Sequence, residues 1–240
     1  MLWRWAFGVG FEAAFSKGVE RGREHRGGLT DRADNRLRAS GVGAVAEPSA
    51  MYGTRLFEQP KHAIVKDRIH AFVARPGPLG LEIGFDHGMC ILDRARRFPE
   101  VNHLGVELRE ARVDAASVHA PPNCLLLRVD ARTLCAALLP DASVDCVYIL
   151  FPTPTSAPKR ALLGAPFAAS LARVLKPAGV LWFASDVVGL ADQARALFPW
   201  EDAPPPPLGL ELSRRERVCR RDSLPVFRLC VRRPERLSHP

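Results

Sequence analysis

Short apolar runs alternate with helical patterns over much of this chain, from about residue 79 to residue 198. Nearly continuous apolar runs are typical of strands that are covered on both faces, as in a parallel sheet. Strands that alternate with helices predict an α/β fold with helices on both faces of the sheet. The expected strands are Leu79–Phe85, His103–Leu108, Cys124–Val129, Val144–Phe151 and Val180–Ala184, and the expected helices are Met89–Arg97, Glu110–His119, Thr133–Leu139, Pro166–Leu175 and Gly189–Phe198.

Two further segments flank this alternation. Helical spacing of apolar residues predicts a helix over Lys61–Ala74, and the following Pro76-Gly77-Pro78 ends it. After the run of four prolines from Pro204, the segment Val226–Val231 predicts a closing strand that is antiparallel to the others. The expected fold class is therefore α/β, a doubly wound and mostly parallel sheet with an antiparallel last strand.

The beginning of the chain has a different pattern. Aromatic residues recur at every fourth position over residues 3–15, as on one face of a helix. Such a face either packs on the rest of the chain or docks on a membrane or a partner, and we favour the first. Residues 21–38 are charged and glycine-rich, as in a mobile arm. We expect an N-terminal extension, partly mobile, over residues 1–60 and one folded domain over residues 61–240.

The composition gives the chain a net positive charge and bears on its partner, its metal content and its location. The 240 residues carry a formal net charge of +8, mostly from arginine, which pairs well with phosphate. An RNA partner would explain this excess, and so would a genome that favours arginine codons. The six cysteines form no CxxC pair and no cluster with zinc spacing, so we expect no metal and a reducing, cytoplasmic location. No apolar run is long enough to span a membrane.

A turn with two glycines follows the first strand, in Leu81-Glu82-Ile83-Gly84-Phe85-Asp86-His87-Gly88. Such a turn lets a ligand approach bare main chain at the edge of an open sheet. It lacks the G-x-G-x-x-G fingerprint of dinucleotide enzymes. A loop with Glu82 and Asp86 would repel a phosphate and attract the cationic sulfonium and ammonium groups of S-adenosyl-L-methionine. Glu82, Gly84, Asp86 and Gly88 are therefore candidate cofactor-binding residues.

Three more acidic residues come at the ends of later strands. Glu107 lies roughly 20 residues past the glycine turn, where a carboxylate can accept from both hydroxyls of a ribose. Asp130 follows the third strand and can accept from an adenine amine, and Asp186 follows the fifth strand. Each of them alone would be explained as a helix N-cap. Because the carboxyl ends of parallel strands share one edge, we expect all these acids and Glu82 to face one crevice.

Taken in order, these motifs resemble the bacterial tRNA (guanine-N7) methyltransferases. The resemblance covers about residues 80–233. It includes Leu81–Phe85, Arg173–Gly179 ahead of the fifth strand, and the tail Ser213–Glu216 followed by Pro225–Arg228. It implies a seven-stranded, Rossmann-like class I methyltransferase fold, S-adenosyl-L-methionine as the cofactor and tRNA as the partner.

The resemblance also implies roles for single residues. Glu82, Glu107 and Asp130 would bind the cofactor, and Asp186, Ser213 and Glu216 would hold the target guanine or shape its pocket. The reaction would transfer the methyl group to guanine N7, whose in-plane lone pair needs positioning and no general base.

The chain departs from the family pattern at the acceptor side. The family has Phe-Pro-Asp-Pro-Trp after the fourth strand, whereas this chain has threonine at both Thr153 and Thr155. Thr153 stands where the family has its catalytic aspartate, so the expected catalytic residues are Thr153 and Asp186. Lys159 and Arg160 remain from a basic stretch and are expected to bind substrate.

Two more positions differ: Asp86 replaces a glycine of the family, and Arg215 replaces an aromatic residue. Three functions therefore stay open. The favoured one is a tRNA guanine-N7 methyltransferase with an altered site. The others are a methyltransferase of the same fold for a small metabolite, and a non-catalytic binder of S-adenosyl-L-methionine or RNA. We expect a monomer or a homodimer.

Overall fold

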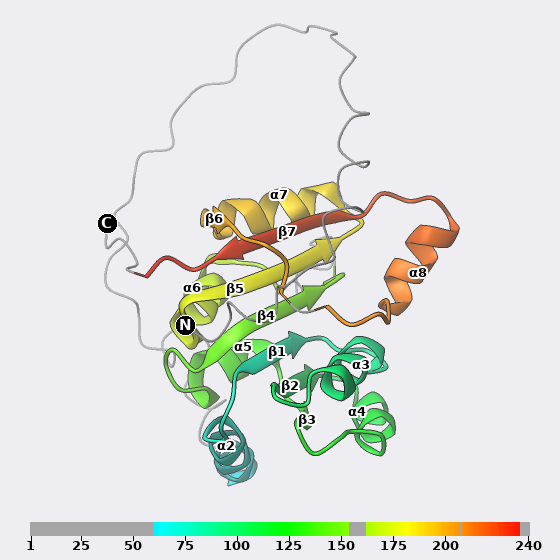
Figure 1. The fold of residues 1–240 in the computed structure, drawn as a ribbon. Helices are drawn as coiled ribbons and strands as arrows, with labels where there is room; N and C mark the ends of the chain where they lie inside the picture. Colours follow the sequence, from blue (N-terminus) through cyan, green and yellow to red (C-terminus); the bar gives the residue numbers. More distant parts are fainter. Residues whose placement is uncertain (1–59, 154–161, 207, 236–240) are drawn as a thin grey trace, which may run out of the picture. The chain divides into compact units, whose positions relative to one another are not determined.

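A seven-stranded sheet forms the centre of the computed structural model, which describes residues 60–153, 162–206 and 208–235 (Figure 1). The strand order is β3-β2-β1-β4-β5-β7-β6. Strands β1 to β5 are parallel, whereas β7 is antiparallel to β5 and to β6. This confirms the predicted fold class. The strands are β1 (Leu79–Ile83), β2 (Asn102–Glu107), β3 (Cys124–Arg128), β4 (Val144–Leu150), β5 (Leu175–Ser185), β6 (Glu201–Asp202) and β7 (Phe227–Arg232).

Helices follow the strands in the predicted alternation. They are α2 (Pro60–Val73), α3 (Met89–Arg97), α4 (Glu110–Ser117), α5 (Ala131–Thr133), which continues as the π-helical turn η3 (Leu134–Leu138), α6 (Ala165–Val174), α7 (Val188–Leu197) and α8 (Arg214–Arg221). Pro166 lies in the first turn of α6, where its missing N–H costs nothing. The predicted N-terminal extension lies outside the described residues.

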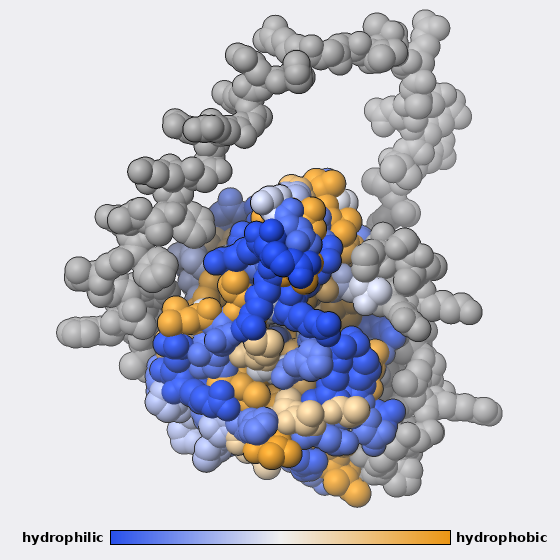
Figure 2. Space-filling model, turned by 90° about the vertical axis from the view of Figure 1, so that its right-hand side faces the viewer, coloured by the Kyte–Doolittle hydropathy of each residue, from blue (hydrophilic) through white to orange (hydrophobic). Residues whose placement is uncertain are grey.

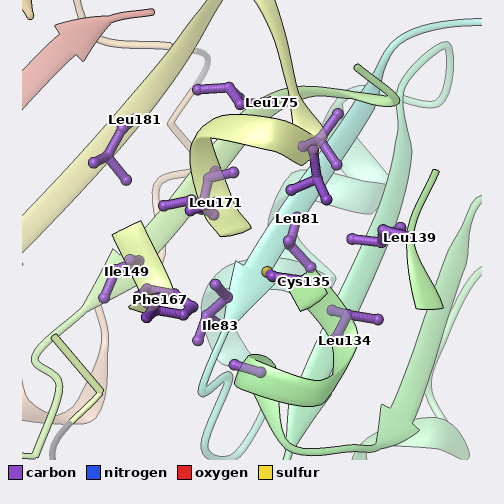
Figure 3. Packing of buried hydrophobic residues seen from close by; sticks show 14 of the residues in the cluster. Leu81, Ile83, Leu134, Cys135, Leu139, Ile149, Phe167, Leu171, Leu175 and Leu181 are labelled. Carbon is purple, nitrogen blue, oxygen red and sulfur yellow. The ribbon is translucent and has the colours of Figure 1, made fainter. Parts of the chain in front are cut away.

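Two apolar clusters cover the two faces of the sheet. In the larger cluster, side chains of η3, α6 and α7 pack on β1, β4 and β5, and Figure 3 shows Phe167 and Leu171 of α6 in it. In the smaller cluster, α3 and α4 pack on the other face through Ile91, Val113 and Leu126. A Cβ atom at Gly105 of β2 would lie 2.8 Å from Ile91, so a larger residue there would make the ends of the neighbouring side chains shift.

The structure differs from the predicted elements where apolar spacing was the only signal. The first strand ends at Ile83, because Gly84 turns the chain with a φ of 74°. Strand β5 begins at Leu175, which pairs with Val144 across an irregularity in the ladder. Helix α8 was not predicted, since a segment with arginine at most positions has no apolar period.

All six cysteines are free thiols. Burial raises the pKa of several of them, that of Cys135 to about 12. Within the described residues, no group of three or more histidine, cysteine or acidic side chains could hold a metal ion. None of the described helices combines the length and the apolar character needed to cross a membrane.

Candidate functional site

The turn after β1 exposes main chain at the carboxyl edge of the sheet. Gly84 has a φ of 74°, and a Cβ atom built there would meet no atom within 4 Å. Gly88 has a φ of 78°, and its Cβ would lie 3.0 Å from that of Ala116, so glycine lets the turn pack against α4. Asp86 between them has a φ of 52°, which is uncommon for a residue with a side chain. The turn is thus open at Gly84 and tightly packed at Gly88.

Glu107 joins this turn to the end of β2. Its side chain is 7% exposed. One carboxylate oxygen, Oε1, accepts hydrogen bonds from the main-chain N–H groups of Leu108 at 2.9 Å and Arg109 at 3.0 Å. The other, Oε2, accepts from the N–H of Asp86 at 3.3 Å. Main-chain donors, with Nε of Arg109 at 3.3 Å from Oε1, therefore hold the Glu107 carboxylate, and Oε2 keeps capacity for a further donor.

Glu82 lies in a different environment from Glu107. Its side chain is 3% exposed and forms an ion pair with Arg94 of α3, which is equally buried. The Arg94 guanidinium stacks over the Tyr148 ring, 3.9 Å from its centroid. Burial raises the pKa of the Glu82 carboxyl, and Arg94 opposes that rise. Glu82 lies beneath α3 and is closed to solvent, while the crevice expected to join it to the other acids stays a prediction. The contribution of Glu82 to cofactor binding also stays a prediction.

The other acids beside the turn also have arginine partners. Asp86 forms ion pairs with Arg112 and, at 4.0 Å, with Arg109. Asp130 caps α5 by accepting from the N–H of Arg132 at 2.8 Å, and it accepts from the Arg132 guanidinium at 2.6 Å. Burial raises the pKa of the Asp130 carboxyl, but the hydrogen bonds from Arg132 outweigh this effect and lower it. Asp130 is therefore a helix cap, as one alternative proposed, and it lies at the end of β3.

The end of β5 and helix α8 bring together the residues expected on the acceptor side. Asp186 accepts from Arg215 Nε at 3.0 Å, and this hydrogen bond lowers the pKa of the Asp186 carboxyl. Ser213 caps α8, its Oγ accepting from the N–H of Glu216 at 3.1 Å. The Glu216 carboxylate accepts from Arg228 Nη2 of β7 at 2.5 Å. The structure thus attaches Ser213 and Glu216 to the same side as Asp186.

Thr153 follows β4 and is exposed. Just before it, Phe151 has a φ of 51°, and its N–H donates to the carbonyl of Ala184 in β5 at 2.7 Å. The chain therefore turns sharply where it leaves the sheet, two residues before Thr153. Lys159 and Arg160 lie outside the described residues.

Sequence reasoning missed the arginines that hold these acids. Arg94, Arg112 and Arg215 each bind a candidate site residue, yet none was predicted to do so. One signal was present: Arg94 follows Cys90 by four positions and so falls on the buried face of α3. A charged residue on such a face needs a buried partner, and Glu82 was the candidate.

Comparisons with known proteins agree with this architecture. The model of a family described as "putative methyltransferase" matches residues 76–202. The chain is 35% identical over 133 residues to a tRNA (guanine-N(7)-)-methyltransferase of Lactiplantibacillus plantarum, covering 52% of this chain and 62% of that protein. It is 37% identical over 135 residues to the Azorhizobium caulinodans protein of the same name, covering 50% of this chain and 57% of that protein. The chain thus spans less than two thirds of the length of these curated relatives.

Two solved structures share the fold at low identity. The 16S rRNA methyltransferase KamB superposes with a TM-score of 0.51 at 17% identity, over 70% of this chain and 93% of that one. A 16S rRNA (adenine(1408)-N(1))-methyltransferase from Catenulisporales acidiphilia superposes with a TM-score of 0.50 at 19% identity, over 70% of this chain and 91% of that one.

Proposed function

Because this chain belongs to the putative methyltransferase family, we propose that it is an S-adenosyl-L-methionine-dependent methyltransferase that acts on guanine N7 in tRNA. The names of the matched relatives support the acceptor. The observation that carries the cofactor assignment is the geometry of Glu107, a buried carboxylate fixed by three main-chain N–H groups beside the open turn at Gly84. We further propose that the folded domain spans residues 61–240 and works in the cytoplasm.

The residues at this edge fit the proposed cofactor. Glu107 Oε2 has one long hydrogen bond and can accept from a ribose hydroxyl, while bare main chain at Gly84 lets a ligand approach β1. Asp130 at the end of β3 can accept from an adenine amine. The cofactor would supply a methyl group on a positively charged sulfur. Asp86 adds negative charge to the turn, although Arg112 offsets part of it.

The chain's task at the acceptor side is orientation, since guanine N7 needs no general base. We assign Asp186 to accept hydrogen bonds from guanine N1 and N2. In the free protein Arg215 holds this carboxylate, so binding of guanine would exchange one partner for another. Thr153 would offer a neutral hydroxyl beside it. We assign substrate binding to Lys159, Arg160, Ser213 and Glu216. We assign to Gly84 and Gly88 the role of shaping the turn that binds the cofactor.

The test is methyl transfer by the purified full chain from labelled S-adenosyl-L-methionine to bulk tRNA. We expect labelled tRNA that chemical treatment specific for 7-methylguanosine cleaves. Glu107→Ala should lose transfer because the cofactor binds weakly, whereas Glu110→Ala, an exposed acid nearby, should retain it. If S-adenosylhomocysteine binds but no tRNA accepts the label, the proposed acceptor is wrong.

A second candidate is a methyltransferase of the same fold that acts on a small metabolite. It is favoured by Arg215, which occupies the Asp186 carboxylate, and by the neutral Thr153. Salt separates the two candidates. Catalytic efficiency on an RNA substrate should fall steeply as salt rises, whereas efficiency on a small neutral metabolite should change little.

A further inference from the structure

Helix α8 presents a stripe of arginines to solvent. It contains five arginines and one glutamate in eight residues. Cys219 is fully buried and fixes the inner face of the helix. Arg214, Arg217 and Arg221 recur at spacings of three and four, so they share the opposite face, and all three are exposed. Figure 2 looks onto this side of the molecule, where hydrophilic side chains dominate the centre of the view.

The charges of this stripe are only weakly neutralised. Arg217 pairs with Glu211 and Arg221 with its neighbour Asp222, and the side chains in both pairs are more than 40% exposed. Exposed pairs of this kind contribute about 0–1 kcal/mol and exchange readily for another anion. Among the described residues, Arg214 has no ion-pair partner.

The stripe continues toward the cofactor turn through Arg112 of α4 and Arg109, the residue that precedes this helix. Arg112 and Arg109 both reach Asp86. The chain just before α8 docks on α3, where Asp93 accepts from the N–H groups of Leu210 and Glu211. Burial lowers the pKa of Arg112, and the positive charge of Arg214 lowers it further. Arg109 also pairs with Glu107, so three arginines meet two acids here, and the positive charge left over favours a bound anion.

We propose that Arg214, Arg217 and Arg221, with Arg109 and Arg112, form one surface that binds the phosphate backbone of the RNA substrate. The inference rests on the proposed function, because it assigns a partner to the same site. All the basic residues are arginines, whose planar guanidinium groups bind phosphate oxygens in pairs. The surface also reaches both halves of the site, from Asp86 at the cofactor turn to α8, whose Arg215 holds Asp186. An RNA strand on it would pass directly beside the acceptor position.

The test replaces the stripe without removing the helix. Arg214→Gln/Arg217→Gln/Arg221→Gln keeps good helix formers and lowers the charge by three. The matched control, Arg68→Gln/Arg195→Gln/Arg232→Gln, removes three exposed arginines of α2, α7 and β7. The full chain is titrated with a fluorescent tRNA transcript at several salt concentrations. We expect the stripe variant to bind about tenfold or more weakly, with a salt slope smaller by about 2. The control should match the wild type.

Cofactor affinity serves as the check on folding and on the identity of the anion. Calorimetry should give the stripe variant an affinity for S-adenosylhomocysteine within about twofold of the wild type. If cofactor affinity falls and RNA affinity does not, the arginines hold the cofactor's carboxylate and the proposal is overturned. Equal RNA affinity and salt slope in variant and wild type would overturn it as well. Binding of the wild type to anionic phospholipid vesicles with none to RNA would have the same consequence.

The outcome separates this inference from the proposed function. If the wild type binds RNA through the stripe but methylates no guanine, the surface stands and the function fails. If it methylates tRNA with an efficiency that the stripe variant retains, the function stands and the surface fails.

Discussion

The two halves of the sheet's carboxyl edge hold their acidic residues in different ways. On the β1–β3 half, Glu107 is buried and held by main-chain N–H groups with a further contact from Arg109, and Glu82 is sealed against Arg94. The more exposed acids of this half, Asp86 and Asp130, depend on arginine side chains alone or beside a cap. On the half formed by β4, β5 and α8, Asp186 and Glu216 are held by the exposed side chains of Arg215 and Arg228. The Glu107 carboxylate is tied to the backbone of the chain, whereas an exposed arginine side chain can be displaced without moving the backbone. The first half is therefore preorganised, and the second can rearrange when an acceptor binds.

The strongest test of the rigid half is Arg94→Ala. It leaves the Glu82 carboxylate buried without a partner, so we expect the free energy of unfolding to fall by about 3–5 kcal/mol. Urea unfolding measures the change. As a control, Glu82→Gln/Arg94→Met removes both charges and should recover much of the loss. A loss below about 1 kcal/mol in Arg94→Ala would mean that this half is not held by the buried pair.

The next largest effect is expected for Glu107→Ala, which removes the charged acceptor at the cofactor turn. Cofactor affinity should fall by about 1–3 kcal/mol, as measured by calorimetry with S-adenosylhomocysteine. Glu110→Ala on the exposed face of α4 is the matched control and should leave the affinity unchanged. Equal affinities in wild type and Glu107→Ala would refute the assignment of Glu107.

The adaptable half is tested by Thr153→Asp, which adds the carboxylate that the resembled family carries. If the acceptor is guanine, the rate of tRNA methylation should rise by about tenfold, since a charged acceptor orients the base better than a hydroxyl. Thr153→Asn supplies the matched shape without the charge and should give little gain. A lower rate in Thr153→Asp would indicate that Thr153 serves another substrate.

The smallest effect, a small loss of stability, is expected for Arg215→Ala, because the ion pair between Arg215 and Asp186 is partly exposed. The free energy of unfolding should fall by less than about 1 kcal/mol at pH 7. Arg215 lowers the pKa of Asp186 below its ordinary 3.8, so the pair's contribution is present above that value and is lost as pH falls through the folded pKa. Unfolding curves of the two proteins should therefore converge in acid. A difference of 3 kcal/mol or more at pH 7 would make this half as rigid as the other.

The succession of most strands and helices along the chain and the positions of the acids could be read from the sequence, because apolar runs and strand ends leave a local pattern. Glu107 and Asp186 were placed correctly at strand ends for this reason. Their partners could not be predicted, since Arg215 lies 29 positions from Asp186 and meets it only when α8 docks. The burial of Glu82 was missed although one signal was present, the position of Arg94 on the buried face of α3.

The most direct test of the central comparison is hydrogen exchange of the full chain with and without S-adenosylhomocysteine. The amides at residues 84–88 and 107–109 line the proposed cofactor edge, while those of α8 belong to the other half. We predict slower exchange at residues 84–88 and 107–109 on binding, with little change in α8. Saturating ligand that leaves the exchange of those two segments unchanged would contradict the account.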